Sequence, residues 1–411
     1  MAGAALTAAV TFAQPAYAAE PTPSATPTAS ATPSESAPAI GAPIPCPHAV
    51  APKVKRTPRP SPPPDNPAHR VVGGDQLDTA GLVIAPGAPQ PPAITAVSWL
   101  VADLDTGEIL GACGPHEYGT PASVQKLLLV ATMMSKLDPK QVVTVTKTDL
   151  AIKPGTSLVG LVQGGHYTIE TLWLGLLLQS GNDAANVLAR LGGGSVAGGV
   201  QLMNEEARRL GAFQTHAVTP SGLDGKGQFT SAYDLALIAR ACFGMDAFRR
   251  YTLTKTAQMP AQPPKYKGFQ IQNENKLILT YPGALGGKTG FTDLARHTYV
   301  GAAERNGRRL VATLLGAEPR PLRGWQQGAA LLDWGFTVAP GASVGHLVTP
   351  GEAAATPSPS GDRAGAAAGA RPASATSGDT GMGPPIAILG SFLVATAALA
   401  GFLHRRRRRR R

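Results

Sequence analysis

Residues 286–316 read GGKTGFTDLARHTYVGAAERNGRRLVATLLG, and this stretch decides the fold of the 411-residue chain. Two runs rich in apolar residues, 298–303 and 309–315, flank Asn306-Gly307. Asn-Gly is the strongest short-range signal for a tight two-residue turn, because both residues readily adopt positive φ angles. The stretch therefore predicts a β-hairpin at the C-terminal end of the folded domain.

A second hairpin is predicted near the start of the domain. The apolar runs 96–102 and 108–112 are joined through a turn at 105–107. Helical patterns fill the space between the hairpins and follow the second one: Val124–Lys136, Ile169–Leu178, Asp183–Leu191, Gly199–Leu210, Ala232–Cys242 and Trp325–Phe336. Strands at both ends of a helical middle predict an antiparallel sheet covered by helices, an α+β domain.

Composition confines this domain to residues 93–340. The part upstream, 19–92, is expected to be a Pro-rich spacer and lead-in, since repeated proline removes backbone donors and favours extended polyproline II geometry. The part downstream, 341–385, is dominated by Ala, Gly, Ser and Pro and is expected to stay unfolded. Seven charges of the formal +11 come from Arg405–Arg411, so the net charge does not indicate a nucleic-acid partner.

Both ends of the chain carry apolar stretches. Residues 386–403 form an uncharged run whose helix would be about 27 Å long, enough to cross a membrane, and the arginine tail at 404–411 would stay cytoplasmic. Residues 1–18 end in the small-x-small pattern AYA, which is typical of signal peptide cleavage. No Lys or Arg precedes this apolar stretch, so either translation starts upstream or the segment is not a signal peptide. With a signal peptide, the domain would face the outside of the cell.

The cysteines and histidines form no zinc pattern, and no metal or cofactor is expected. Cys46 falls in the spacer, while Cys113 and Cys242 are expected to be small buried residues rather than a bridge or reactive thiols. His116-Glu117 begins like a zincin helix, but no second histidine follows at the required spacing, so His116 is interpreted as a surface turn residue. Structural or rim positions are expected for three further histidines: His166, His216 and His297.

Ser123-Val124-Gln125-Lys126 places a hydroxyl and an amine on one helical face. A helix should begin here, because Pro121 suits a first turn and the apolar run LLLVATMM follows. A serine in that turn keeps its backbone N–H free to stabilise an oxyanion, as one half of an oxyanion hole. The amine of Lys126 can reach the Ser123 hydroxyl and take its proton, provided that burial and a second cation lower the lysine pKa.

Lys288-Thr289-Gly290 supplies that second cation together with a hydroxyl. The glycines around this motif suggest a strand edge along which a substrate backbone can lie. A charged Lys288, with Thr289 donating a hydrogen bond, would hold a carboxylate, which predicts a substrate with a free C-terminus. The backbone N–H of Phe291 is the candidate for the other half of the oxyanion hole.

Ser180-Gly181-Asn182 lies in a connection between two helical patterns. Ser180 would relay a proton towards the leaving amine, and Asn182 would hydrogen-bond a substrate amide and fix the lysine geometry. Each motif alone is common as a helix cap or a turn, whereas the ordered trio indicates an acyl-transfer serine site. A rival nucleophile in GASVG, residues 341–345, lacks the following helix that a hydrolase elbow needs.

On these motifs the sequence resembles the penicillin-binding serine D-alanyl-D-alanine carboxypeptidases of the low-molecular-weight type, and in detail their actinobacterial members. The resemblance runs from about residue 93 to residue 336 and rests on five stretches: PASVQK, LLLQSGNDAANVLA, PSGLDGKGQFTSAYDLALIAR, NENKL and GGKTGFTDLARHTYVGAAE. It implies a transpeptidase-like α+β fold, with helices on both faces of an antiparallel sheet and a helical subdomain. It also implies removal of the terminal D-alanine from peptidoglycan pentapeptide stems.

The resemblance assigns roles residue by residue. Ser123 is implied as the nucleophile that both substrates and β-lactams acylate, and Lys126 as the base. The remaining implied site residues are those of the second and third motifs: Ser180, Asn182, Lys288, Thr289 and Gly290.

The resemblance leaves alternatives open. A class A β-lactamase shares the first and third motifs but needs a Glu-x-x-Leu-Asn string, which the sequence does not contain. A non-catalytic penicillin sensor or wall-binding module would use the same pocket without turnover. Family members often carry a second β-domain and an amphipathic anchor, whereas this chain predicts a transmembrane anchor. A sorting signal is a further reading of the tail, although SGDTG at 377–381 lacks the expected Leu-Pro or Leu-Ala.

Overall fold

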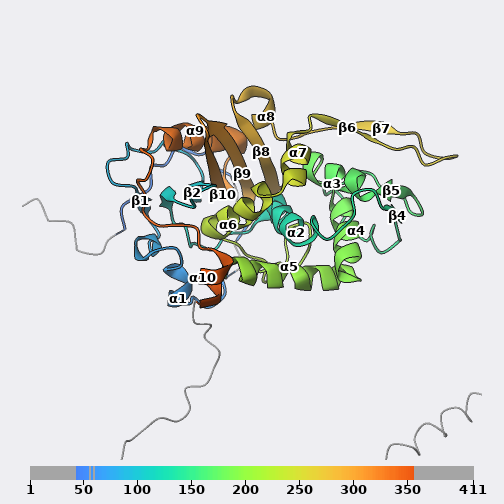
Figure 1. Ribbon diagram of the computed structural model, residues 1–411, viewed down its shortest axis with the longest axis horizontal. Coiled ribbons are helices and arrows are strands. Elements are labelled where there is room, and N and C mark those ends of the chain that lie inside the picture. The colour runs from blue at the N-terminus through green and yellow to red at the C-terminus, as the bar shows by residue number, and fades with distance from the viewer. Residues whose placement is uncertain (1–42, 55–56, 59–60, 356–411) are drawn as a thin grey trace, which may run out of the picture. The chain divides into compact units, whose positions relative to one another are not determined.

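The computed structural model describes residues 43–54, 57–58 and 61–355 of the chain. Its centre is a six-stranded antiparallel sheet with the strand order β1-β3-β2-β10-β9-β8 (Figure 1). The strands of this sheet are β1 (Leu82–Ile84), β2 (Ser98–Asp103), β3 (Ile109–Cys113), β8 (Ala284–Thr292), β9 (Arg296–Arg305) and β10 (Arg308–Ala317). Segments from the two ends of the domain therefore share one sheet, as the two predicted hairpins require.

The hairpin between β9 and β10 is confirmed. Arg305 pairs with Arg308, and the two residues between them have positive φ angles, 53° at Asn306 and 77° at Gly307. Positive φ at both central positions is what a type I′ turn requires. The hairpin between β2 and β3 is also confirmed, and Gly107 in its turn has a φ angle of 82°.

The predicted helical middle is present as a series of helices. Side-chain caps mark the starts of three of them, because Thr168, Ser195 and Ser231 each accept an N–H three residues ahead. In the described residues the helices are α1 (Pro67–Arg70), α2 (Lys126–Met133), α3 (Ile169–Leu178), α4 (Asn182–Gly193), α5 (Val196–Leu210), α6 (Ala232–Phe243), α7 (Asp246–Leu253), α8 (Leu277–Thr280), α9 (Gly324–Thr337) and α10 (Pro350–Ala355). Short 3₁₀ turns occur at Asp75–Leu77 and Ala122–Gln125.

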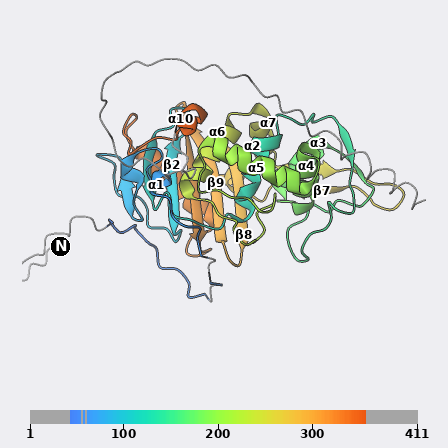
Figure 2. The same ribbon diagram turned by 90° about the horizontal axis from the view of Figure 1, so that it is seen from below.

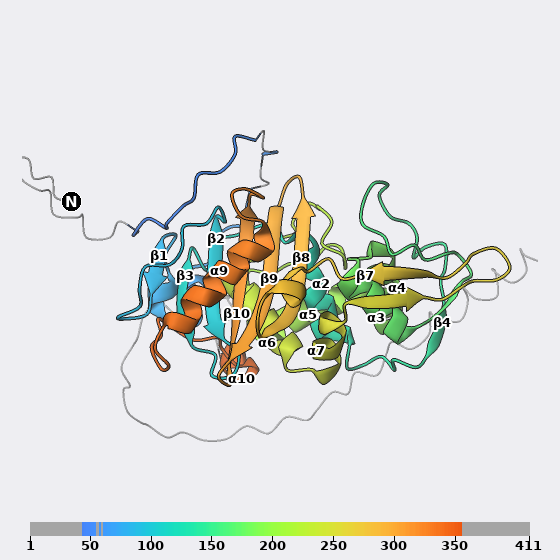
Figure 3. The same ribbon diagram turned by 90° about the horizontal axis from the view of Figure 1, so that it is seen from above.

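Helices bury both faces of the sheet. Successive residues of β2 alternate between two hydrophobic clusters, with Leu100 and Ala102 in one and Trp99 and Val101 in the other. The helix α9 crosses one face (Figure 3), while α6 packs on the other face with α2 and α5 beyond it (Figure 2). The predicted α+β fold with helices on both faces is confirmed.

A helical subdomain adjoins the sheet at its β8 edge (Figure 1). It contains α3, α4 and α7, and two antiparallel ribbons that the sequence does not predict flank it. The ribbons are β4 (Val142–Thr144) with β5 (His166–Thr168), and β6 (Thr256–Met259) with β7 (Phe269–Gln272).

The folded domain extends past both predicted limits, 93 and 340. At its start, β1 pairs with β3, and the N–H of Leu82 donates to the carbonyl of Ile44. At its end, Val344 N donates to Ile109 O, and Ile109 N donates to Gly345 O. The composition of these segments resembles a spacer, but their backbones supply hydrogen-bond partners that the edge of the β2–β3 hairpin needs.

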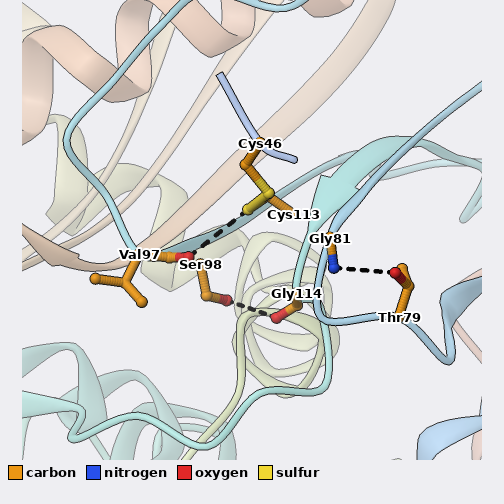
Figure 4. Close-up of a disulfide and its surroundings, with 7 residues drawn as sticks. All are labelled: Cys46, Thr79, Gly81, Val97, Ser98, Cys113 and Gly114. Atoms are coloured by element: carbon orange, nitrogen blue, oxygen red, sulfur yellow. Dashed lines mark hydrogen bonds between the residues drawn. A yellow bond between two sulfur atoms is a disulfide. The ribbon is translucent and has the colours of Figure 1, made fainter. Parts of the chain in front are cut away.

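Cys46 and Cys113 form a disulfide, so the expectation that Cys113 is unbridged is wrong (Figure 4). The segment around Cys46 is held on both sides, because Leu82 N of β1 donates to Ile44 O and Ala49 N donates to Ile94 O ahead of β2. The two cysteine Cα atoms lie 6.0 Å apart. Closure of a loop of this length stabilises the fold by about 4 kcal/mol in the chain-entropy account. Cys242 is a free, buried cysteine, as predicted.

His116 is also placed differently from the surface turn that the sequence predicts. Its ring is buried, with Nδ1 at 2.8 Å from Gln214 Oε1 and Nε2 at 3.1 Å from the carbonyl of Val72. Desolvation lowers its pKa, and its two contacts tie the lead-in segment to the domain.

No helix within the described ranges is both long and apolar enough to span a bilayer. The predicted signal peptide at 1–18, the transmembrane run at 386–403 and the arginine tail at 404–411 lie outside the described residues. The same holds for most of the spacer predicted at 341–385.

Candidate active site

The first motif lies where a 3₁₀ turn leads into α2, at the centre of the molecule. Ser123 belongs to the turn Ala122–Gln125, and Lys126 is the first residue of α2. The Nζ atom of Lys126 lies 2.8 Å from Ser123 Oγ. The predicted pairing of hydroxyl and amine is therefore present, on the first turns of a helical segment whose N–H groups lack intrahelical acceptors.

Lys126 is fully buried and has three acceptors around its amine. Besides Ser123 Oγ, these are Asn182 Oδ1 at 2.8 Å and the carbonyl of Ser221 at 2.9 Å. Desolvation, followed by the charge of Lys288, holds the pKa of Lys126 well below its usual range. A neutral amine donates two hydrogen bonds, which satisfies Asn182 and Ser221 and leaves its lone pair for the Ser123 proton.

The second motif lies at the start of α4, beside this amine. Ser180 has a φ angle of 60°, and its Oγ is buried with no hydrogen-bond partner among the described residues. Strain and an unsatisfied polar atom at one position are typical of functional sites. Asn182, the first residue of α4, contacts Lys126 as predicted.

Asp183 fixes the loop that borders the second motif. Its carboxylate accepts N–H groups from Val159, Gly160 and Leu161, each at 2.9 Å. Asn182 N also donates to the carbonyl of Ser157 in the same loop. These bonds hold residues 153–161 along one wall of the cleft.

The third motif lies on β8, at the edge of the sheet. Lys288 is 2% exposed, and its Nζ donates to the carbonyl of Thr289 at 2.8 Å. Burial lowers its pKa to about 8, while the carboxylate of Glu274 acts in the opposite direction. Lys288 therefore remains mostly charged at neutral pH, and its charge suppresses protonation of Lys126.

Gly290 allows β8 to pass close to the nucleophile. A Cβ atom at this position would lie 2.8 Å from Ser123 N and 3.1 Å from Val124 N, and it would overlap Thr298 Oγ1. Glycine is thus the residue that lets the strand edge approach the Ser123 N–H, as the predicted oxyanion hole requires.

These parts meet in one cleft with a volume of about 1040 Å³. Lys126 and Lys288 lie beneath its wall, since neither is more than 2% exposed. All the other predicted site residues line the cleft: Ser123, Ser180, Asn182, Thr289, Gly290 and Phe291. The arrangement can activate a hydroxyl, stabilise an oxyanion and hold an anionic group within one enclosed space.

Two contributors to the site were not predicted. The carbonyl of Ser221 holds Lys126, and Glu274 lines the cleft with a charge that raises the pKa of both lysines. Both residues fall in stretches on which the resemblance rests, but a backbone carbonyl has no residue-type signature.

Three histidines, His166, His216 and His297, occupy structural or rim positions as the sequence predicts. His166 and His216 are exposed, and His297 lies on the rim of the cleft with its ring centroid 4.7 Å from that of Phe291. Across the described part of the chain, Lys126 is the side chain that hydrogen-bonds Ser123 Oγ, and no cluster of three or more His, Cys, Asp or Glu is placed to hold a metal ion.

Known proteins are similar to this chain in sequence and in fold. Residues 85–319 match the peptidase S11 family, described as D-alanyl-D-alanine carboxypeptidase. The chain is 43% identical over 278 residues to D-alanyl-D-alanine carboxypeptidase DacB2 of Mycobacterium tuberculosis, covering 66% of this chain and 90% of that protein. It is 34% identical over 261 residues to D-alanyl-D-alanine carboxypeptidase DacD of Escherichia coli, covering 61% and 65%.

Solved structures agree with this result. A crystal structure of a D-alanyl-D-alanine carboxypeptidase from Mycobacterium tuberculosis H37Rv aligns with a TM-score of 0.61 at 41% identity, covering 64% of this chain and all of that one. The Streptomyces K15 DD-transpeptidase aligns with a TM-score of 0.57 at 26% identity, covering 61% of this chain and all of that one. With a family match over more than half of its length, the chain belongs to the peptidase S11 family and is a serine-type D-alanyl-D-alanine carboxypeptidase.

Proposed function

We propose that the enzyme is anchored in the cell membrane by a single helix and acts outside the cell, where it removes the terminal D-alanine of peptidoglycan pentapeptides through an acyl-enzyme on Ser123. The observation that carries the chemistry is the 2.8 Å contact between Lys126 Nζ and Ser123 Oγ, made by an amine whose pKa is strongly lowered. An uncharged amine at this distance is a competent general base.

Acylation follows from the positions of the other groups. As the Ser123 proton moves to Lys126, the oxygen attacks the carbonyl carbon of the penultimate D-alanine. The N–H groups of Ser123 and Phe291 stabilise the resulting oxyanion. Ser180 relays to the leaving nitrogen the proton that Lys126 took from Ser123, so Lys126 is neutral again when the C–N bond breaks. D-Alanine departs, and an ester remains on Ser123. Water then hydrolyses the ester and restores the serine.

Lys288 and Thr289 select substrates with a free C-terminus. Thr289 lines the cleft and can donate a hydrogen bond to a carboxylate, while the buried charge of Lys288 lies directly behind it. β-Lactams carry a carboxylate and a reactive amide carbonyl, so they are expected to acylate Ser123 in the same orientation.

The disulfide supports an extracellular location. Disulfides form and persist in oxidising compartments and are rare in the cytosol, and Cys46–Cys113 ties the N-terminal segment to the sheet. The apolar run at 386–403 followed by arginines supports a membrane anchor with a cytoplasmic tail.

The chemistry is tested on the full-length chain in detergent. The wild type should release D-alanine from diacetyl-L-Lys-D-Ala-D-Ala with steady turnover, and Ser123→Ala should reduce the rate to the uncatalysed level. A stable penicillin adduct without turnover would instead indicate a sensor, and equal activity of the two proteins would rule out Ser123 as the nucleophile.

The location is tested by adding protease to intact bacteria that express the chain with a C-terminal epitope after Arg411. Protease should remove the peptidase domain and leave the epitope protected. A domain that resists protease until the cells are lysed would contradict the extracellular assignment.

A further inference from the structure

The ribbon formed by β6 and β7 projects from the helical subdomain as an extended arm (Figures 1 and 3). We define the arm as residues 254–273. The two strands pair from Thr256 with Gln272 to Met259 with Phe269, and the tip closes through a bridge between Gln262 and Tyr266. Met259 and Ile271 are buried against the subdomain, where α3 packs on both strands. Asn273 is buried as well, and most of the remaining arm residues are exposed.

The arm is cationic along its whole length. It carries the exposed lysines Lys255, Lys265 and Lys267, and its sequence contains no Asp or Glu. Two aromatic rings accompany the lysines, since Tyr266 and Phe269 are each 44% exposed and Lys265 Nζ lies 5.3 Å from the Tyr266 ring centroid. Lysines interleaved with half-exposed rings offer both charge and a stacking surface to an anionic ligand.

The base of the arm is attached to the catalytic motifs. Gln179, which precedes Ser180, donates from its side chain to the carbonyl of Gln272 at 2.8 Å. The next residue after the arm, Glu274, donates its N–H to Leu178 O and lines the catalytic cleft. A ligand held along the arm therefore leads directly to the cleft.

The outer part of the arm is attached to β5 and lies against the loop 153–161 that forms the cleft wall. Gln262 exchanges two hydrogen bonds with the backbone of His166, at 2.8 and 2.9 Å. The ring of Phe269 packs over Gly160 in the loop 153–161, where a Cβ atom would lie 3.5 Å from Phe269 Cζ. Leu158 in the same loop is 51% exposed, which extends the apolar part of the surface towards the cleft.

We propose that the arm binds the polymeric glycan–peptide that carries the substrate stems, and so increases the action of the enzyme on peptidoglycan relative to small soluble peptides. This inference rests on the proposed function. Peptidoglycan stems bear free carboxylates at regular intervals, which complement three lysines on an arm that ends at the cleft. A lipid surface fits less well, because Tyr266 and Phe269 are the large hydrophobic side chains exposed on the arm, and two rings offer little apolar area for insertion.

The test compares two charge variants that lose three positive charges each. The arm variant combines Lys255→Gln, Lys265→Gln and Lys267→Gln. The matched control combines Lys53→Gln, Lys136→Gln and Arg208→Gln, which are exposed positions outside the arm. Both are made in the full chain with Ser123→Ala for binding measurements and with Ser123 intact for kinetics. Binding is measured by co-sedimentation with purified, insoluble peptidoglycan.

The arm variant should bind peptidoglycan about tenfold more weakly than the control, because exposed charge contacts each contribute modestly and three are lost. Wild-type binding should weaken when ionic strength rises from about 0.05 M to about 0.5 M, and the arm variant should lose most of this salt dependence. Release of D-alanine from the soluble peptide should be the same in the wild type, the arm variant and the control variant when Ser123 is intact, so an inactive wild type would contradict the proposed function and not the arm.

Equal binding of the arm and control variants to peptidoglycan would overturn the inference. So would arm-dependent flotation with vesicles rich in anionic phosphatidylglycerol together with unchanged peptidoglycan binding, since that result would make the arm a lipid-docking element.

Discussion

Two buried lysines with different protonation states are the central residues of the site. In the proposed mechanism, Lys126 acts as a base only when neutral, whereas Lys288 attracts a carboxylate only when charged. Both are buried, and Lys126 experiences in addition the charge of Lys288, so its pKa falls further. The proposed mechanism needs a neutral Lys126 and a charged Lys288 at the same pH, and the stronger causes that lower the pKa of Lys126 favour this state.

This separation predicts the pH profile. The value of kcat/KM should fall as pH rises past about 8, where Lys288 loses its proton. Glu274 raises the pKa of Lys288, so Glu274→Gln should move the alkaline limb to lower pH. The pH dependence of D-alanine release measures this shift, with the exposed Lys276→Gln as control. An alkaline limb that stays in place in Glu274→Gln would show that Lys288 does not set it.

Gly290 provides a steric test of the oxyanion hole. In Gly290→Ala the new methyl group would lie 2.8 Å from Ser123 N and would push β8 away from the nucleophile. Acylation by a fluorescent penicillin should slow by at least about 100-fold, the cost of losing one oxyanion donor. The melting temperature should change little, because β8 can shift outward at the sheet edge.

Gly351→Ala is the control for that measurement, because a Cβ there meets its nearest neighbour at 3.9 Å. If Gly290→Ala were acylated by the penicillin as fast as the wild type, β8 would not contribute to the oxyanion site.

Sequence reasoning at this scale named the side chains of the three motifs from their residue types, and the structure brings them together around one cleft, while their roles stay predictions. It did not find the carbonyl of Ser221 or the positive φ of Ser180. Both are backbone properties that arise only when distant segments are packed together.

Among the elements, the loop 153–161 is held in place by hydrogen bonds to the N-terminal end of α4. The carboxylate of Asp183 accepts three consecutive N–H groups of this loop, which also contains cleft residues such as Ser157. Hydrogen bonds to a charged acceptor are worth about 1.5–3 kcal/mol each relative to their loss. The loop wall therefore depends on one side chain at the start of a helix.

Asp183→Ala should loosen this wall without removing any of the three motifs. Amide hydrogen exchange at 159–161 should increase by at least about tenfold, and KM for the soluble peptide should rise more than kcat falls, since the wall positions substrate. Asp138→Ala removes an exposed carboxylate that caps only its own turn and serves as control. Unchanged exchange at 159–161 would contradict the assigned role.

Hairpins and long helices were predictable, whereas the short strands were not. The Asn306-Gly307 turn and the alternation of β2 are local signals. By contrast, β1, β4 and β5 have three residues each, and β6 and β7 are largely exposed, so their sequences show no clear period. Their pairing is decided by the partners that the fold brings to them.

At the scale of the whole molecule, the described segment 43–54 belongs to the fold. Its composition resembles a spacer, and three cysteines spread over the chain gave no unique pairing, so the bridge was missed. The contacts of Ile44 and Ala49 with the sheet bring Cys46 to Cys113, 67 residues away in sequence. Closure of that loop restricts the unfolded chain and adds stability that the small contact area of the segment alone does not provide.

Cys46→Ser should therefore reduce the free energy of unfolding by about 4 kcal/mol. Urea unfolding followed by tryptophan fluorescence measures the change. Wild-type protein in excess reductant should unfold at the same urea concentration as the variant. The active-site residues do not contact the bridge, so turnover of the soluble peptide should remain at the wild-type level under native conditions. If reductant destabilised Cys46→Ser as much as the wild type, the effect would come from Cys242 or the reagent, and the bridge would not be the stabilising element.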